Sequence, residues 1–307
     1  MTAPTAQNLR SDLPLVRFRP PRFGLAAAPI GRLADPGADH LALATVDAAY
    51  GAGIRFFDTA PQYAGRSEQR LGTALARRPR GEYLVATKVG RLLTRSGARP
   101  DFSAAGIERS LAGSLERLGI DTIDLAFIHD AYEDPDEHWR QAIDEAYPAL
   151  HTLREQGVVR AVGVAMDQWQ LLDRFVRDTD VDAVLLNGGY TLIDQSAGPL
   201  LDRCRTRGVA AVVGSVLPEP VRPSGQPGKP PDVPANLRQI AAVCERSGVT
   251  LPQVALAFPA QHPAVTSVLV DAASPAEIRA QAALVRRPIP VGVWHELAAG
   301  NLVDTHR

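Results

Sequence analysis

The feature that most constrains the fold is a repeat in hydrophobicity, in which short apolar runs alternate with amphipathic stretches along the whole chain. Eight of the apolar runs predict strands, near residues 23–29, 54–58, 83–88, 123–129, 158–164, 181–187, 208–214 and 265–270. Segments with helical spacing lie between them, and several end on glycine, as helix C-termini often do. This pattern is typical of an α/β protein with a parallel sheet. Eight strands with their crossovers account for the 307 residues, so we expect a single (β/α)8 TIM-barrel domain over residues 1–307.

Two segments lie outside the repeat. Residues 1–20 form an N-terminal extension before the first predicted strand. Residues 217–234, which follow the seventh predicted strand, are crowded with proline and glycine and cannot be regular structure. A segment after a barrel strand lies on the catalytic face, so this one is either an exposed connection or a lid.

Charge and hydropathy exclude several classes of partner. The 33 Lys and Arg nearly balance the 34 Asp and Glu without a long basic run, so we expect neither nucleic acid nor a membrane surface as partner. No run of about 18 apolar residues and no leader pattern occurs, which favours the cytoplasm. Cys204 and Cys244 lack the spacing of a zinc or redox motif, and no metal site is expected. Nothing in the sequence determines the oligomeric state.

Polar residues close three consecutive predicted strands: Asp58, Lys88 and His129. Each has an ordinary explanation alone, as a turn cap, a lysine reaching solvent or a core histidine. All C-terminal ends of barrel strands open onto one face, so together the three are expected to converge there. Tyr63 follows the second strand and is expected to lie over the same rim.

These four residues suit proton transfer at one oxygen atom. A free tyrosine has a pKa of about 10, and an ammonium within about 4 to 6 Å lowers it. We expect Lys88 to supply that charge, Asp58 to hold Lys88, and His129 to donate a hydrogen bond to a substrate oxygen. The four residues provide no hydride carrier, so a redox reaction needs a cofactor.

The chain resembles the aldo-keto reductase family, and within it the branch of D-threo-aldose (L-fucose) 1-dehydrogenases. The resemblance covers nearly the whole chain and includes GIRFFDTAPQYAGRSEQRLG, ATKVG, LERLGIDTIDLAFIHD, REQGVVRAVGVAMDQW and LLNGGYTLIDQSA. It implies a catalytic tetrad of Asp58, Tyr63, Lys88 and His129. It also implies a nicotinamide cofactor along the C-terminal face, with Tyr63 as general acid in reduction and general base in oxidation of a sugar, ketone or aldehyde.

The resemblance also implies cofactor contacts, some of them altered. The expected cofactor-binding residues are Asp167, Asn187, Tyr190, Gly214, Ser215, Leu217, Asp271, Ser274 and Gln281. Asp167 replaces the branch's usual asparagine, and Leu217 to Pro220 replace its usual Phe-Asn-Ser-Gly run. Prolines supply no N–H to a phosphate, and Glu219 adds a repelling charge.

The predicted helix after the eighth strand begins with a capping box of Ser274 and Glu277 around Pro275. This is either a well-capped helix start or the holder of the adenosine end of the cofactor. Ala273 replaces the branch's usual arginine for the 2′-phosphate, and Asp271 replaces a glycine. We therefore expect NAD(H) to be used at least as well as NADP(H).

Two other hypotheses fit the same sequence. The altered cofactor contacts suit a cofactor-independent lyase, isomerase or cyclase that uses the tetrad for proton transfer only, and a barrel retained for binding without catalysis is the third hypothesis. For the substrate, Tyr132, Trp139 and Trp169 are candidates to stack on a sugar face, or they pack in the core. Oxidation of an aldose to a lactone and ketone reduction in specialised metabolism fit equally well.

Overall fold

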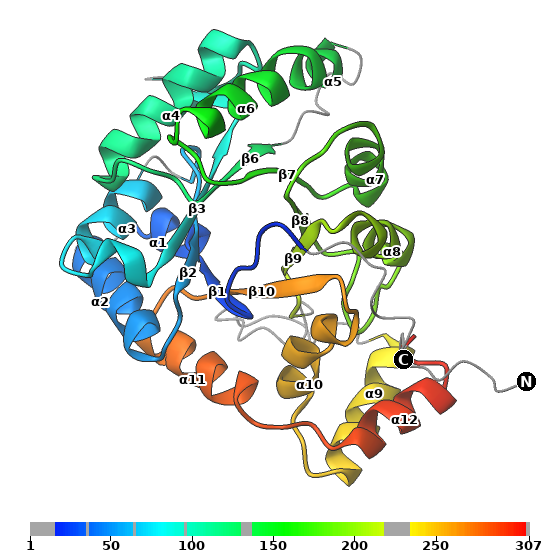
Figure 1. Ribbon diagram of the computed structural model, residues 1–307. Helices are drawn as coiled ribbons and strands as arrows, with labels where there is room; N and C mark the ends of the chain where they lie inside the picture. The colour runs from blue at the N-terminus through cyan, green and yellow to red at the C-terminus, as the bar shows by residue number, and fades with distance from the viewer. Residues whose placement is uncertain are drawn as a thin grey trace, which may run out of the picture.

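Eight parallel strands close into a barrel in the computed structural model, which describes residues 16–34, 37–63, 66–94, 97–129, 137–217 and 234–304 (Figure 1). Around the barrel the order is β1-β10-β9-β8-β7-β6-β3-β2. The strands are β1 Phe23–Ala26, β2 Phe56–Asp58, β3 Leu84–Val89, β6 Leu125–His129, β7 Val162–Met166, β8 Ala183–Asn187, β9 Ala210–Gly214 and β10 Val265–Asp271. The predicted (β/α)8 architecture is confirmed.

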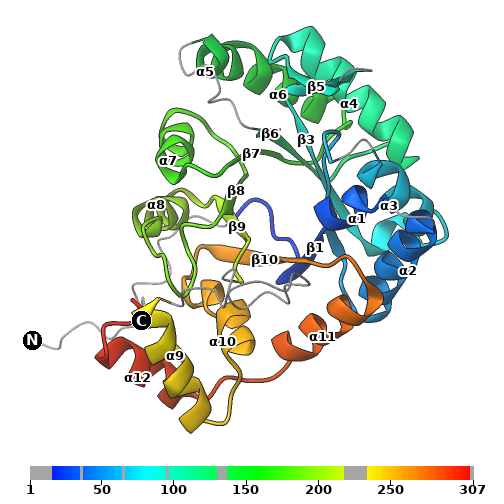
Figure 2. The same ribbon diagram turned by 180° about the vertical axis from the view of Figure 1, so that it is seen from behind.

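Helices ring the barrel on its outside, as the two opposite views show (Figures 1 and 2). The helices of this ring are α2 Ala38–Gly51, α3 Ser67–Leu75, α4 Ala104–Leu118, α6 Tyr147–Glu155, α7 Trp169–Asp178, α8 Gly198–Arg207, α10 Leu251–Ala257 and α11 Pro275–Val285. Helices α9 Ala235–Arg246 and α12 Val291–Ala299 pack side by side beyond this ring. Short pieces are α1 Ala28–Arg32, α5 Glu137–Gln141, the π-helical η3 Ala142–Ala146, and the 3-10 turns η2 Arg80–Glu82 and η5 Pro259–Gln261.

Local sequence explains the ends of these helices. The Ser103 side chain caps α4 by accepting a hydrogen bond from the Gly106 N–H, and the helix ends at Gly119 in the left-handed conformation, with φ of 66°. Helix α8 ends in the same way at Gly208. The glycines that follow the predicted helices thus act as helix stops.

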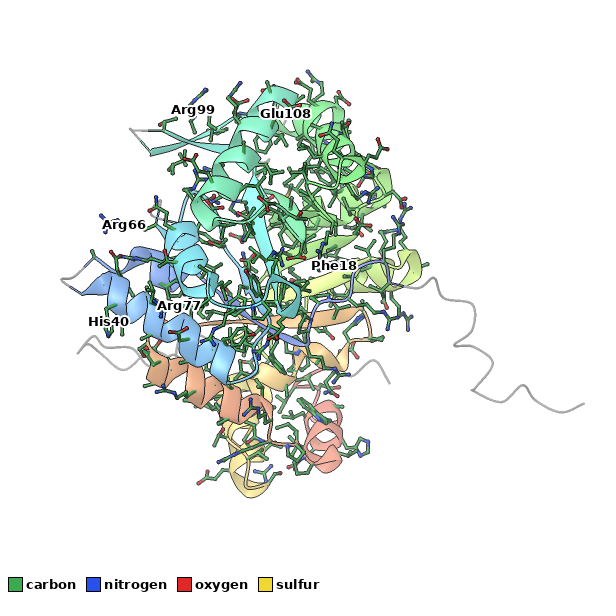
Figure 3. The ribbon with its side chains drawn as sticks, turned by 60° about the vertical axis from the view of Figure 1, so that its left-hand side comes forward. Phe18, His40, Arg66, Arg77, Arg99 and Glu108 are labelled. Carbon is green, nitrogen blue, oxygen red and sulfur yellow. The ribbon has the colours of Figure 1, made fainter. Side chains whose placement is uncertain are left out.

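The strand boundaries differ from the prediction by up to four residues, and one hairpin was not predicted. The first strand ends at Ala26, because helix α1 begins at Ala28 with Pro29 in its first turn. The fifth strand begins at Val162 rather than 158, and Val159 makes only an isolated bridge. An unpredicted antiparallel hairpin, β4 Arg91–Thr94 with β5 Gly97–Pro100, follows β3. Its strands have four residues each; β4 is half-buried, β5 is mostly exposed, and the Arg99 side chain projects outward in Figure 3.

Alternation along the strands divides the core into two layers. Side chains such as Phe56, Ala86 and Phe127 fill the barrel interior, while Phe57, Val85 and Ile128 belong to the layer under the helices. The start of the described chain completes the barrel base, because Phe18 (Figure 3) packs against the interior layer and the Arg17 N–H donates to the Gly208 carbonyl.

Buried carboxylates stabilise the N-terminal end of the barrel. Asp124, just before β6, accepts hydrogen bonds from Arg80, Arg160 and the Val85 N–H at 2.5, 2.9 and 2.8 Å. Asp182, just before β8, accepts from Arg154 and the Val162 N–H. No helix within the described ranges is long and apolar enough to cross a bilayer.

Candidate active site

Strand alternation places the expected site residues at one end of the barrel interior. Asp58 stands two residues after the interior Phe56, Lys88 two after Ala86, and His129 two after Phe127. The same spacing holds for Asp167, Asn187, Gly214 and Asp271, which follow interior residues on β7, β8, β9 and β10. Because alternate side chains of a strand share a face, all seven positions belong to the interior face at its C-terminal rim.

Asp58 and Lys88 form a buried ion pair. The Lys88 ammonium lies 2.8 and 2.6 Å from the two carboxylate oxygens of Asp58 and also donates to the Thr59 carbonyl at 3.0 Å. Their side chains are only 1% and 2% exposed. Burial raises the pKa of Asp58, with Lys88 opposing it. Burial acts to lower the pKa of Lys88, but Asp58 and Tyr63 raise it above its usual value. The lysine therefore remains charged at the bottom of the rim.

Tyr63 lies next to this pair, with the Lys88 nitrogen 5.1 Å from the centre of its ring. The loop that carries Tyr63 is held from several sides. The Tyr63 N–H donates to the Ala60 carbonyl, and Ser67 donates to the Ala27 carbonyl at 2.9 Å. A Cβ at Gly31 would lie 2.5 Å from the Tyr63 carbonyl oxygen, so only glycine lets α1 approach this loop.

The pKa of Tyr63 departs from the expectation. Burial raises it above the ordinary value, and the Lys88 charge lowers it only in part, while the charges of Asp58 and Asp271 add to the increase. The expected net lowering is therefore wrong, because desolvation outweighs the ammonium. The Tyr63 phenol keeps its proton throughout the neutral range.

His129 faces a residue that the sequence did not point to. The Gln62 side-chain nitrogen lies 2.6 Å from the Nδ1 atom of His129. Burial, together with the positive charges of Lys88 and Arg91, holds the pKa of His129 well below its usual range. The imidazole is therefore neutral.

Across the rim, Asp167, Asn187 and Gly214 form a polar group. The Asn187 amide donates to the Asp167 carboxylate at 3.3 Å. A Cβ at Gly214 would lie 2.6 Å from the Asn187 side-chain oxygen, so a larger residue there would displace the Asn187 amide. The next residue, Ser215, has a φ of 53°, an uncommon left-handed conformation for a residue other than glycine.

The start of α11 borders a cavity of about 180 Å³. Ser274 caps the helix by accepting from the Glu277 N–H at 3.3 Å, and the Glu277 carboxylate accepts from the Ala273 N–H at 2.8 Å. Gln281 donates to the Asp271 carbonyl at 2.6 Å, whereas its side-chain oxygen is buried without a hydrogen-bond partner among the described residues. The lining includes Leu217, Asp271, Ala273, Glu277 and Gln281.

Comparison with known proteins identifies the family. Residues 23–299 match the model of the Aldo/keto reductase family. This chain belongs to that family. It is 36% identical to D-threo-aldose 1-dehydrogenase from a Pseudomonas species, with 93% of this chain and 95% of the relative covered. It is 32% identical to pyridoxal 4-dehydrogenase from Microbacterium luteolum, with 92% and 94% covered. This aldo/keto reductase is an oxidoreductase.

Solved structures agree with this fold. An aldo-keto reductase from Bacillus halodurans, in its holo form, superposes with a TM-score of 0.74 at 24% identity over 92% of each chain. At this identity the likeness concerns the barrel alone. Aldo/keto reductases use NAD(P)(H). Gln281 lines the cavity beside α11, and its side-chain oxygen is buried without a hydrogen-bond partner among the described residues, so the lining includes a polar group that is compatible with such a cofactor.

Two of the predicted contact residues are buried against other aromatic rings, and a third is not described. Tyr190 is fully buried and stacks on Phe258 at 5.2 Å between ring centres, so the structure gives it a packing role. Trp139 is likewise buried, 5.0 Å from Phe175, and does not present a face for a sugar. Tyr132 and residues 218–220 lie outside the described residues.

Trp169 is still a candidate to contact substrate. It is partly buried at the start of α7, directly after the rim strand β7, and packs against the outer core layer. Within the described residues, no group of three or more His, Cys, Asp and Glu side chains is arranged to hold a metal ion.

Proposed function

We propose that this aldo/keto reductase is an NAD(P)(H)-dependent oxidoreductase that interconverts an alcohol and a carbonyl on a sugar or a compound of similar size. Tyr63 donates the proton in reduction and accepts it in oxidation. The observation that carries the proposal is the convergence of Tyr63, the buried Lys88–Asp58 pair and neutral His129 at one rim. The nicotinamide, when bound, supplies or accepts the hydride.

Each residue of the chain has a distinct task in this proposal. Lys88 provides a fixed positive charge that stabilises the phenolate formed when Tyr63 gives up its proton. Asp58 keeps that ammonium in place with two hydrogen bonds. Neutral His129 donates to the substrate oxygen and so orients it toward Tyr63. A protonated Tyr63 at neutral pH suits reduction, while oxidation benefits from more alkaline solution.

For the substrate, the relatives support a small hydroxylated or aldehyde compound. One is named for a D-threo-aldose and the other for pyridoxal, and each matches over nearly its whole length. The first favours oxidation of an aldose at its anomeric carbon to a lactone. Substrate loops that include Tyr132 lie outside the described residues, so the choice among sugars rests on this likeness.

For the cofactor, we infer that NAD(H) is bound at least as well as NADP(H). The residues that would hold its adenosine end are Asp271, Ser274, Glu277 and Gln281, and Asn187 with Gly214 would flank the nicotinamide end. The Glu277 carboxylate already accepts the Ala273 N–H, which removes a donor from a 2′-phosphate. The negative charges of Glu277 and Asp271 also repel a phosphate at this helix start.

The test is a titration of the purified protein with NADH and, separately, NADPH, followed by tryptophan and nicotinamide fluorescence. We expect NADH to bind in the micromolar range and at least as tightly as NADPH. Ala273→Arg should strengthen NADPH binding about tenfold, because it adds a charged donor for the 2′-phosphate. Glu277→Gln should also strengthen NADPH binding. Glu155→Gln, at an exposed position of α6, is the matched control and should leave binding unchanged.

Two results would contradict these inferences. NADPH binding much tighter than NADH would overturn the cofactor preference. Binding of neither cofactor below about millimolar would overturn the oxidoreductase mechanism and favour the cofactor-independent proton-transfer reaction.

A further inference from the structure

The contact between Gln62 and His129 determines which ring nitrogen of His129 carries the hydrogen. In the orientation that the Gln62 amide has in this structure, its nitrogen lies 2.6 Å from His129 Nδ1, and an amide nitrogen carries two hydrogens and can only donate. Nδ1 therefore accepts. In a neutral imidazole one nitrogen donates and the other accepts, so the hydrogen of His129 is on Nε2.

The surroundings of His129 agree with this arrangement. Among the described residues, the Lys88 ammonium, from β3, and the Arg91 guanidinium, from the hairpin strand β4, act on it, and both oppose a second proton on the ring. Protonation would also turn Nδ1 into a donor that faces the Gln62 donor at 2.6 Å. Charge and hydrogen bonding thus favour the same single form of the ring.

We propose that Gln62 is a positioning residue that holds His129 as its Nε2–H tautomer, so that the imidazole meets a substrate oxygen as a hydrogen-bond donor. The part that concerns substrate rests on the proposed function. Gln62 directly precedes Tyr63 in the loop after β2, so one short loop places the proton donor and also sets the state of the second donor.

The direct test is the tautomer of His129 in solution, measured by long-range ¹H–¹⁵N spectra of protein with ¹⁵N-labelled histidine. His129→Asn identifies the signals of this ring among the seven histidines. In the unmodified protein we expect hydrogen on Nε2 and none on Nδ1, and this form should persist below the ordinary titration range of histidine. In Gln62→Glu the carboxylate can only accept, so Nδ1 should gain a hydrogen. Gln69→Glu, an exposed position on α3, is the matched control and should leave the spectrum unchanged.

Kinetics provide the second readout. Gln62→Met has a similar length but no donor, and should lower kcat/KM about tenfold while the unfolding midpoint stays near that of the unmodified protein. Gln62→Glu should add a pH-dependent loss, because an imidazolium beside the new carboxylate titrates nearer neutrality. Gln62→Asn keeps an amide donor on a shorter side chain, so its kcat/KM should lie between those of Gln62→Met and the unmodified protein.

Hydrogen on Nδ1 in the unmodified protein would overturn the proposal, as would an unchanged tautomer in Gln62→Glu. The tautomer is measured without turnover or cofactor. The expected tautomers together with no activity on any carbonyl would therefore refute the proposed function and still support the role of Gln62.

Discussion

The two ends of the barrel each contain a buried carboxylate, but the basic partners of these carboxylates differ in their exposure to solvent. At the N-terminal end, Asp124 is fully buried, yet its partners Arg80 and Arg160 are 30% and 59% exposed and keep much of their hydration. At the C-terminal end, Asp58 has a partner, Lys88, that is itself 1% exposed. The first arrangement joins loops to strands with little desolvation of the arginines. The second removes both charges from water, which seldom favours folding, and places the ammonium beside Tyr63. The difference indicates that the N-terminal pair serves stability and the C-terminal pair serves chemistry.

The largest effect that would test this comparison is on catalysis. Tyr63→Phe should reduce kcat about 10²- to 10⁴-fold, because the phenol is the only group of the four proposed to exchange a proton with substrate. The free energy of unfolding should stay within about 1 kcal/mol, since the ring and its packing remain. Steady-state rates and urea denaturation measure the two quantities, and a variant that keeps its rate would refute the assignment of Tyr63.

The next effect is on stability at the C-terminal end. Asp58→Asn should lower the free energy of unfolding by about 3 kcal/mol, because it leaves the buried Lys88 charge without its partner. Urea denaturation at neutral pH measures this loss. It should shrink at high pH, where Lys88 can lose its proton, and a loss that is independent of pH would argue that packing rather than charge causes it.

The matched change at the other end should cost less. Asp124→Asn should lower the free energy of unfolding by about 2 kcal/mol, because Arg80 and Arg160 can turn toward water and only the Val85 N–H remains buried. The rate per folded molecule should not change. If Asp124→Asn costs more than Asp58→Asn, the contrast between the two ends is wrong.

The smallest predicted effect is a shift in a pH profile. Oxidation needs Tyr63 as phenolate, and burial raises the Tyr63 pKa, so the oxidation rate should rise with pH from neutral into the alkaline range. Lys88→Met removes the charge that lowers this pKa, so the midpoint should move to higher pH, in addition to a fall in rate. The pH dependence of kcat/KM measures the midpoint. A midpoint that does not move, at a measurable rate, would contradict the role of Lys88.

Residues at strand ends were predictable and loop contacts were not. Asp58, Lys88 and His129 each close an apolar run, so strand counting alone brings them to one rim. Gln62 carries no such signal, because its importance depends on the path of the loop after β2 relative to β6. The hairpin β4–β5 was not predicted for a similar reason, since its two four-residue strands pair with each other and, among the described strands, not with the barrel.

The sequence alone determined the barrel and the strand ends that supply its rim, because the spacing of apolar residues dictates which side chains face inward. It also determined the capped start of α11, since capping depends on neighbours within one turn. Only the tertiary structure decided the direction of the Tyr63 pKa shift, because the balance of desolvation against Lys88 depends on how deeply both are buried. It likewise placed Trp139 and Tyr190 in the core, where their aromatic partners come from helices distant in sequence.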